Sequence, residues 1–224
     1  DRALRLLQGA ERLHPDPARA KTLALLELKA STLKPVLKKA GTHVMEYYLS
    51  LPKGWTPERK WPVVVAVEGS GCYWLGYLNG FVARRGDLPF ILVTPLTLSN
   101  TNNLSDVRDR YHYPKELMDH WDSIKTGPSR SLGEAMQKKA EVSMMRAQFD
   151  TEGLCAVLDD LRREYGAEEK FFLTGFSGGG VLTWDILFQH PERLEAVAPA
   201  CSAFMGCGSM SQAPERATLP ITVF

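Results

Sequence analysis

The residue best placed for chemistry is a serine that stands between glycines. Residues 175–179 read Gly-Phe-Ser-Gly-Gly, a G-x-S-x-G pentapeptide with Ser177 at its centre. On a sharp turn between a strand and a helix, such a serine presents its hydroxyl as a nucleophile for a carbonyl carbon. The apolar run at 171–173 and the helical spacing of apolar residues at 181–187 supply that setting.

The glycines of the motif explain how such a turn would close. Gly175 and Gly179 lack a Cβ atom, so a strand and a helix can approach closely there. The N–H of Gly178 would start the helix and point to where negative charge collects on a substrate oxygen. A turn whose serine only caps the helix is the alternative. A dinucleotide-binding loop is excluded, because the glycines at 178–180 lack the G-x-G-x-x-G spacing.

The composition is that of an ordinary globular protein. The chain has 224 residues, of which 44% are hydrophobic and 24% charged, with a formal net charge of +1; this length suits one domain. The near-neutral charge gives no reason to expect nucleic acid as a partner. No apolar run reaches the roughly 18–20 residues of a membrane span. The chain begins with Asp1 rather than Met, which fits a cleaved signal peptide and favours a secreted or periplasmic location.

The four cysteines leave two interpretations open. Cys201 and Cys207 lie six residues apart and would form a small disulfide in an oxidising compartment. The alternative is two unpaired thiols. Because the sequence has no C-x-x-C pair, we expect no structural zinc site. We also expect no other metal and no organic cofactor.

The pattern of apolar residues predicts a helical start followed by alternating strands and helices. Residues 1–40 have helical spacing, with Asp16 as an N-cap, Pro17 at the first helical position and a bend at Pro35. A long polar, aromatic-rich segment runs from 95 to about 132. The predicted strands are 43–51, 62–67, 88–94, 171–173, 194–198 and 219–224, and the predicted helices are 76–85, 134–165 and 181–189. This alternation predicts a mostly parallel sheet with helices on both faces.

From about residue 43 to its end, the chain resembles the α/β-hydrolases, and among them the esterases related to polyhydroxybutyrate depolymerases and feruloyl esterases. Three features carry the resemblance: the turn at 175–179, the loop Glu68-Gly69-Ser70-Gly71-Cys72 after the strand at 63–67, and the run Gln189-His190-Pro191-Glu192-Arg193 before 194–199. The resemblance implies an α/β-hydrolase domain at 41–224, incomplete at its C-terminus and lacking the last strand, preceded by an N-terminal helical extension at 1–40.

The resemblance also implies roles for individual residues. Ser177 would be the nucleophile, and the backbone N–H groups of Gly178 and Ser70 would form the oxyanion hole. In the family the loop that supplies the second donor usually reads His-Gly-x. Here Glu68 takes the place of that histidine, so the geometry of this loop departs from the family pattern.

A serine needs a general base, and the base needs an acid to orient it. In this fold the two follow the nucleophile in the order acid, then histidine. The histidine that follows Ser177 is His190, about 18 Å away along the intervening helix, so we expect it to mark the end of that helix.

We therefore expect the acid and the base beyond Phe224. They would lie in a remainder of the same protein or in a second chain after cleavage; the alternative is a domain that has lost catalysis. Inside the chain, His112, His120 and Glu215 are weaker candidates. The 224-residue form alone is expected to be inactive, and hydrolysis of p-nitrophenyl acetate that depends on Ser177 would contradict this.

The sequence thus favours a serine esterase that cleaves a carboxylic ester through an acyl-enzyme on Ser177. A small-molecule or polymeric ester is the expected substrate. An aromatic or polyester acyl group would suit the aromatic residues of two loops, Tyr73, Trp74, Tyr111, Tyr113 and Trp121. Two alternatives stay open: a non-catalytic binding domain of the same fold, and a serine peptidase of the same fold.

Overall fold

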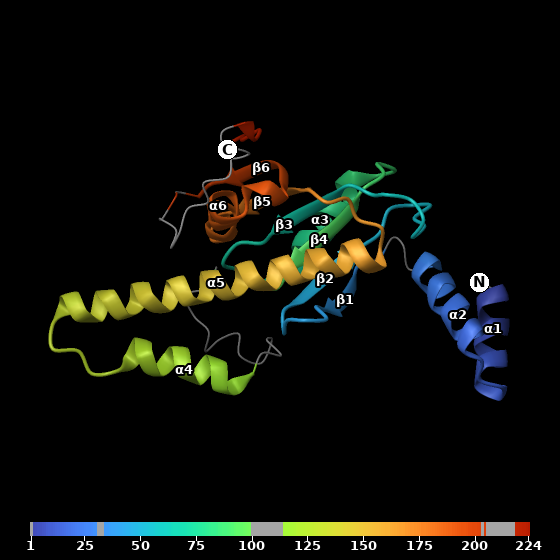
Figure 1. Ribbon diagram of the computed structural model, residues 1–224, viewed down its shortest axis with the longest axis horizontal. Helices are drawn as coiled ribbons and strands as arrows, with labels where there is room; N and C mark the ends of the chain where they lie inside the picture. Colours follow the sequence, from blue (N-terminus) through green and yellow to red (C-terminus); the bar gives the residue numbers. More distant parts are fainter. Residues whose placement is uncertain (1, 31–33, 100–113, 203, 205–217) are drawn as a thin grey trace.

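The computed structural model describes residues 2–30, 34–99, 114–202, 204 and 218–224. Figure 1 shows its elements in chain order. The helices are α1 (Arg2–Leu13), α2 (Pro17–Ala30), α3 (Trp74–Arg85), α4 (Lys115–Thr126), α5 (Leu132–Glu164) and α6 (Gly179–Gln189), with a 3₁₀ turn η2 (Pro191–Arg193). The strands are β1 (Val36–Lys39), β2 (Glu46–Ser50), β3 (Val63–Val67), β4 (Ile91–Pro95), β5 (Phe171–Phe176) and β6 (Leu194–Ala200).

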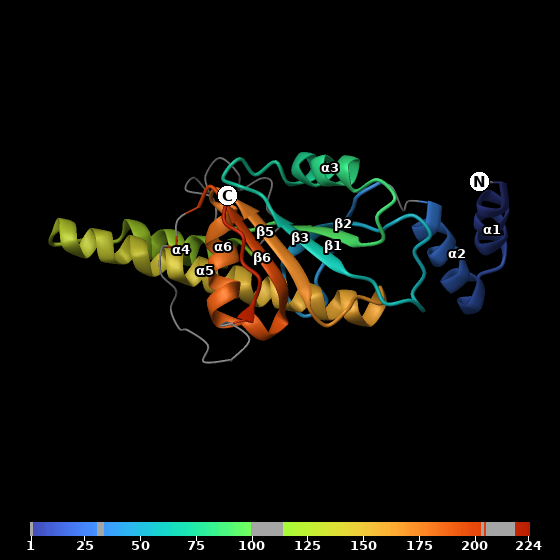
Figure 2. The same cartoon turned by 90° about the horizontal axis from the view of Figure 1, so that it is seen from above.

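The strands form one twisted sheet in the order β1-β2-β4-β3-β5-β6. The four strands from β4 to β6 run parallel, and β2 and β1 extend the sheet antiparallel. Figure 2 shows α3 on one face of the sheet and α5 and α6 on the other. The prediction of a mostly parallel sheet covered on both faces is confirmed. Because parallel strands all end at one edge, the loops that follow β3, β4, β5 and β6 meet there.

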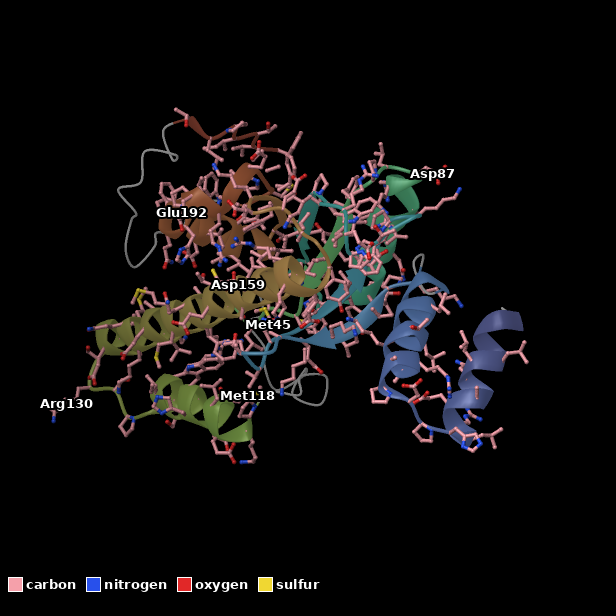
Figure 3. All side chains as sticks on the ribbon, turned by 45° about the vertical axis from the view of Figure 1, so that its right-hand side comes forward. Met45, Asp87, Met118, Arg130, Asp159 and Glu192 are labelled. Carbon is pink, nitrogen blue, oxygen red and sulfur yellow. The ribbon has the colours of Figure 1, made fainter. Side chains whose placement is uncertain are left out.

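The central strands are the most apolar part of the chain. All five residues of β4 and four of the five in β3 are buried, as expected for strands with a helix layer on each face. Met45, next to β2, is fully buried and points toward α5 (Figure 3). A methyl group built on Gly153 of α5 would lie 2.7 Å from its Cε atom. The helix therefore sits on the sheet at a distance that only a glycine allows.

The first strand contradicts the prediction of helix throughout residues 1–40. Residues Val36–Lys39 pair antiparallel with β2, from Val36 opposite Leu49 to Lys39 opposite Glu46. Pro35 removes a backbone donor and blocks continuation of a helix, and the chain after it joins the edge of the sheet instead. The division into an extension at 1–40 and a domain at 41–224 stays a prediction. In the structure, β1 lies before residue 41 and still belongs to the sheet.

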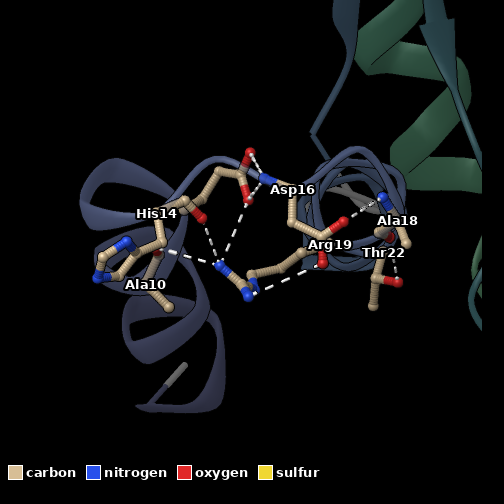
Figure 4. A network of polar contacts seen from close by, with 7 residues as sticks. Ala10, His14, Asp16, Ala18, Arg19 and Thr22 are labelled. Atoms are coloured by element: carbon tan, nitrogen blue, oxygen red, sulfur yellow. Dashed lines mark hydrogen bonds and ion pairs between the residues drawn. The ribbon is translucent and has the colours of Figure 1, made fainter.

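The two N-terminal helices pack against each other through a polar turn (Figure 4). Asp16 caps α2 by accepting a hydrogen bond from the N–H of Ala18 at 3.0 Å, which confirms the predicted N-cap. The Arg19 guanidinium reaches back to the carbonyl oxygens of Ala10 and His14, at 3.3 and 2.7 Å. These bonds satisfy carbonyl groups that the end of α1 leaves without a helical partner.

Two other regions differ from the predictions. The segment from 95 to 132 contains α4, an unpredicted helix whose buried face holds Met118 and Trp121. Residues 219–224 run parallel to β6 as predicted, with Val197 donating to Pro220 and accepting from Thr222, both at 3.0 Å. They form an isolated bridge rather than a full strand. Within the described residues, no helix combines the length and apolar character needed to cross a membrane.

Two buried carboxyl groups face each other where α5 packs on α6. Asp150 of α5 accepts hydrogen bonds from the N–H groups of Leu98 and Ser99 in the loop after β4, at 2.9 and 2.6 Å. Asp185 of α6 is only 4% exposed. Burial, and to a smaller extent the charge of Asp150, raise the pKa of Asp185 to about 6. Burial likewise raises the pKa of Asp150 to about 6, against the effect of its hydrogen bonds.

We predict that Asp185→Asn stabilises the protein at pH 8 and not at pH 4. A carboxyl group whose pKa is raised by folding holds its proton more tightly in the folded state, so its ionisation costs stability as the pH rises from about 4 to 6 and above. The amide avoids that cost, and a shift of this size corresponds to roughly 1–3 kcal/mol. Urea denaturation at the two pH values measures it. Asp87→Asn, at an exposed ion pair with Lys53, is the control and should change little.

Candidate active site

Ser177 lies in the turn between β5 and α6. Its backbone has φ of +51°, a left-handed conformation that non-glycine residues rarely adopt. The side chain is exposed. The backbone is held on both sides: the N–H of Ser177 donates to the carbonyl of Ala200 at 2.8 Å, and its own carbonyl accepts from Gly180 at 3.0 Å. The turn is therefore strained, fixed in place, and open to solvent at the hydroxyl.

The two predicted glycines of the turn lie where no side chain fits. A methyl group built on Gly175 would lie 2.4 Å from the carbonyl oxygen of Gly179. One built on Gly179 would lie 2.5 Å from the carbonyl oxygens of both Val67 and Glu68 at the end of β3. Such contacts are with backbone, which cannot rotate away. The strand, the helix and the neighbouring strand thus meet at van der Waals distance through these glycines.

The loop after β3 lies against this turn. A methyl group built on Gly69 would lie 3.2 Å from the carbonyl oxygen of Phe176 and 3.6 Å from the Cβ atom of Ser177. Ser70 follows in the loop and is exposed. Within the described part of the chain, the N–H groups of Ser70 and Gly178 donate to no protein acceptor. The structure thus brings the loop of Ser70 beside Ser177, and both predicted donors remain available to a ligand.

Strained backbone gathers at this edge of the sheet. Among the described non-glycine residues, a positive φ occurs at Cys72, Ser177 and Cys201, with values of +53°, +51° and +50°. They follow β3, β5 and β6 respectively. Strained residues of this kind persist where the surrounding structure fixes them and are common at functional sites.

Glu68 begins the loop after β3, with its carbonyl oxygen against Gly179 of the serine turn, and is 8% exposed. Its carboxylate accepts hydrogen bonds from the N–H groups of Cys72 and Tyr73. Burial raises the pKa of Glu68, and these two hydrogen bonds act in the opposite direction. In the sequence, Glu68 stands out only as a departure from the family pattern, because its burial depends on how the chain folds.

The described histidines lie away from Ser177. His190 ends α6 as predicted, with its N–H bonded to the carbonyl of Ile186, and its ring pairs with Glu192. His43 packs on Phe149 with ring centroids 4.4 Å apart; it precedes β2, which is three strands from β5, about 14 Å at the usual spacing.

Some of the weaker sequence candidates lie in the described part of the chain, and others lie outside it. His120 is exposed on α4. His112, Glu215 and Cys207 lie outside the described residues, as do Tyr111 and Tyr113. Cys201 is an exposed free thiol. Among the described residues, no group of three or more His, Cys, Asp and Glu side chains is arranged to hold a metal ion.

A groove of about 840 Å³ lies between α4, α5 and α6. Its α6 side consists of Val181, Asp185 and Gln189, and its apolar lining includes Trp121 and Met144. Neither Ser177 nor the loop at 69–72 lines it. Of the predicted aromatic wall, Trp121 lines this groove, Trp74 is buried, and Tyr73 is 73% exposed beside the loop of Ser70.

The comparisons with known proteins rest on structure. No protein-family model matches the sequence, and no curated protein matches it. The fold superposes on poly(aspartic acid) hydrolase-1 from Sphingomonas sp. KT-1 with a TM-score of 0.52 and 14% identity, covering 84% of this chain and 69% of that chain. With the strand order and the turn at Ser177, this decides the fold. The chain has an α/β-hydrolase fold.

Two further solved structures are similar at lower TM-scores. A thermostable esterase matches with a TM-score of 0.48 and 22% identity over 85% of this chain. The epoxide hydrolase VrEH1 from Vigna radiata matches with a TM-score of 0.48 and 13% identity over 77% of this chain. The chain spans 45% of the esterase chain and 39% of the epoxide hydrolase chain.

We predict that Gly179→Ala disrupts the turn at Ser177. The new methyl group would meet two backbone carbonyl oxygens at 2.5 Å, so β3 and α6 must separate at a cost of about 1–3 kcal/mol. Thermal and urea denaturation measure the loss. Gly80→Ala in α3 is the matched control, because its methyl group would make an ordinary 3.5 Å contact with Arg84; it should be neutral or stabilising.

We also predict that Ser177→Gly is more stable than Ser177→Ala. Glycine adopts a φ of +51° without strain, whereas alanine keeps the strain of the serine. The expected difference in unfolding free energy is about 0.5–1 kcal/mol. Urea denaturation of both variants gives the answer, and an alanine variant at least as stable as the glycine variant would refute the idea that this backbone is strained.

Proposed function

We propose that the protein is a serine hydrolase that cleaves a carboxylic ester through an acyl-enzyme on Ser177. The supporting observation is the exposed side chain of Ser177 on a left-handed turn between β5 and α6, fixed by two backbone hydrogen bonds. A serine that only caps a helix has no need of that conformation. Strain at a fixed, exposed serine is what a nucleophile on such a turn requires.

The reaction follows from the groups around that hydroxyl. Ser177 Oγ attacks the ester carbonyl and forms a tetrahedral intermediate with a negative oxygen. The N–H groups of Gly178 and Ser70 receive that oxygen as an oxyanion hole. Removing one such donor typically costs about 2.7–4 kcal/mol of transition-state stabilisation. Collapse of the intermediate expels the alcohol and leaves the acyl-enzyme, which water then hydrolyses.

The attack also requires a base that takes the proton of Ser177. None of the described histidines is in contact with Ser177, and His190 at the far end of α6 is bonded to Glu192 instead. In this proposal the base and the acid that orients it therefore come from outside the described residues. No metal or organic cofactor takes part in the proposed steps.

The proposed substrate class is a carboxylic ester. Hydrolases of this fold act on several bond types, as the poly(aspartic acid) hydrolase from Sphingomonas illustrates by its name, so the fold does not identify the acyl group. Tyr73, exposed at the start of α3 after the loop of Ser70, offers an aromatic surface. An aromatic or polyester acyl group would pack against it.

We predict that a fluorophosphonate probe labels Ser177 in the full-length protein. The phosphorus is attacked by an activated serine, and the adduct places an oxygen where the oxyanion would lie. Labelling should be lost in Ser177→Ala and retained in Ser129→Ala, a change at an exposed serine between α4 and α5. Mass spectrometry of the labelled peptide locates the adduct.

The same experiment separates the alternatives. No labelling of the folded full-length protein under any condition would favour a non-catalytic binding domain. Labelling without turnover of p-nitrophenyl esters, but with turnover of peptide p-nitroanilides, would favour a serine peptidase over an esterase.

A further inference from the structure

Glu68 connects the serine turn to the loop that follows β3. It is the first residue after β3, and its backbone carbonyl oxygen lies against Gly179, 2.5 Å from a methyl group built there. Its main chain is therefore part of the packing that holds the turn at Ser177. Its side chain turns back onto its own loop, where it binds the N–H groups of Cys72 and Tyr73.

The carboxylate of Glu68 binds backbone groups of that loop. It accepts hydrogen bonds from the N–H groups of Cys72 and Tyr73. Its Oε1 atom would lie 3.2 Å from a methyl group built on Gly71, so the loop passes close around it. Tyr73 is the N-cap residue of α3 and has no side-chain capping bond of its own. Glu68 thus supplies a negative charge at the start of α3, where the helix dipole favours one.

The loop needs such an anchor because its backbone is strained. Cys72 has φ of +53° and is buried, with its Sγ atom 3.8 Å from the carbonyl oxygen of Ser70. A left-handed residue is kept in place only when its surroundings fix it. The bond from Cys72 N–H to Glu68 fixes this one directly. The direction of the Ser70 peptide, two residues earlier, depends on it.

We infer that Glu68 is a positioning residue, whose carboxyl group holds the loop at 69–73 so that the N–H of Ser70 faces the oxyanion formed at Ser177. This inference rests on the proposed function. Two donors of the loop already bind the carboxylate, so its charge is directed into the loop. Tyr77 of α3 is a further titratable group near Glu68, beside Cys72 and Tyr73; burial raises the pKa of Tyr77 to about 12, and the charge of Glu68 contributes.

The test compares Glu68→Gln with Glu195→Gln in the full-length protein. Glutamine removes the negative charge and keeps one acceptor oxygen for the N–H groups of Cys72 and Tyr73. Glu195 is exposed on β6 and controls for loss of a carboxylate. We expect the rate of fluorophosphonate labelling of Ser177 to fall 10- to 100-fold in Glu68→Gln. For p-nitrophenyl esters kcat should fall with KM nearly unchanged, because the oxyanion exists only after attack.

A second readout reports the loop without requiring activity. Cys72 is 5% exposed, whereas Cys201 is an exposed thiol on another loop. Alkylation by iodoacetamide, mapped by mass spectrometry, gives the ratio of Cys72 to Cys201 modification. We expect this ratio to rise at least fivefold in Glu68→Gln at constant pH and to stay unchanged in Glu195→Gln. If Glu68→Gln does not fold, Glu68→Asp is tested instead. Aspartate keeps the charge but is one methylene shorter, so its carboxylate is withdrawn from the loop, and the same results are expected.

The outcomes separate the inference from the proposed function. If the wild type is labelled and Glu68→Gln is labelled at the same rate with Cys72 still protected, the inference fails and the proposed function stands. If the wild type is never labelled but Cys72 becomes reactive in Glu68→Gln, the proposed function fails and the role of Glu68 in holding the loop stands. Equal losses of kcat and stability in both glutamine variants would also overturn the inference.

Discussion

The geometry of the serine turn depends on direct backbone contact at the point where β3, β5 and α6 meet. Gly179 lies against the carbonyl oxygens that end β3, and Gly175 lies against the first turn of α6. Because no side chain separates them, the end of β5 must turn sharply, and the residue at the turn takes a left-handed conformation. The exposure of Ser177, its fixed backbone and the nearness of the Gly69 loop all follow from this contact.

Buried carboxylates hold the loops around that contact. Glu68 binds N–H groups of the loop after β3, and Asp150 binds those of Leu98 and Ser99 after β4. In both cases the side chain accepts from backbone groups that a loop leaves without strand or helix partners. Burial raises the pKa of each acid, so each is ionised at a cost in free energy. Burying these acids lowers the stability of the protein, and their hydrogen bonds hold the loops at one edge of the sheet in a defined shape.

The sequence was most informative where local pattern and packing agree. The continuous apolar runs of β3 and β4 and the glycines around Ser177 predicted the parallel sheet and the turn, because each needs only neighbouring residues. The strand β1 was missed because helical spacing before Pro35 was extended past it, and α4 was hidden in a segment rich in polar and aromatic residues. The roles of Glu68 and Asp150 depend on partners that folding brings together: four and five residues away for Glu68, and about fifty residues away for Asp150. No spacing rule relates such partners.

The left-handed residues Cys72, Ser177 and Cys201 all lie at the same rim, each after a different parallel strand. Among the described non-glycine residues, left-handed backbone conformations therefore occur in the loops at this rim and not within the strands. Under native conditions local opening begins where it costs least. Amide hydrogens of the rim would accordingly exchange with solvent ahead of those in β3 and β4, and the rim would be the last part to become ordered as the chain folds.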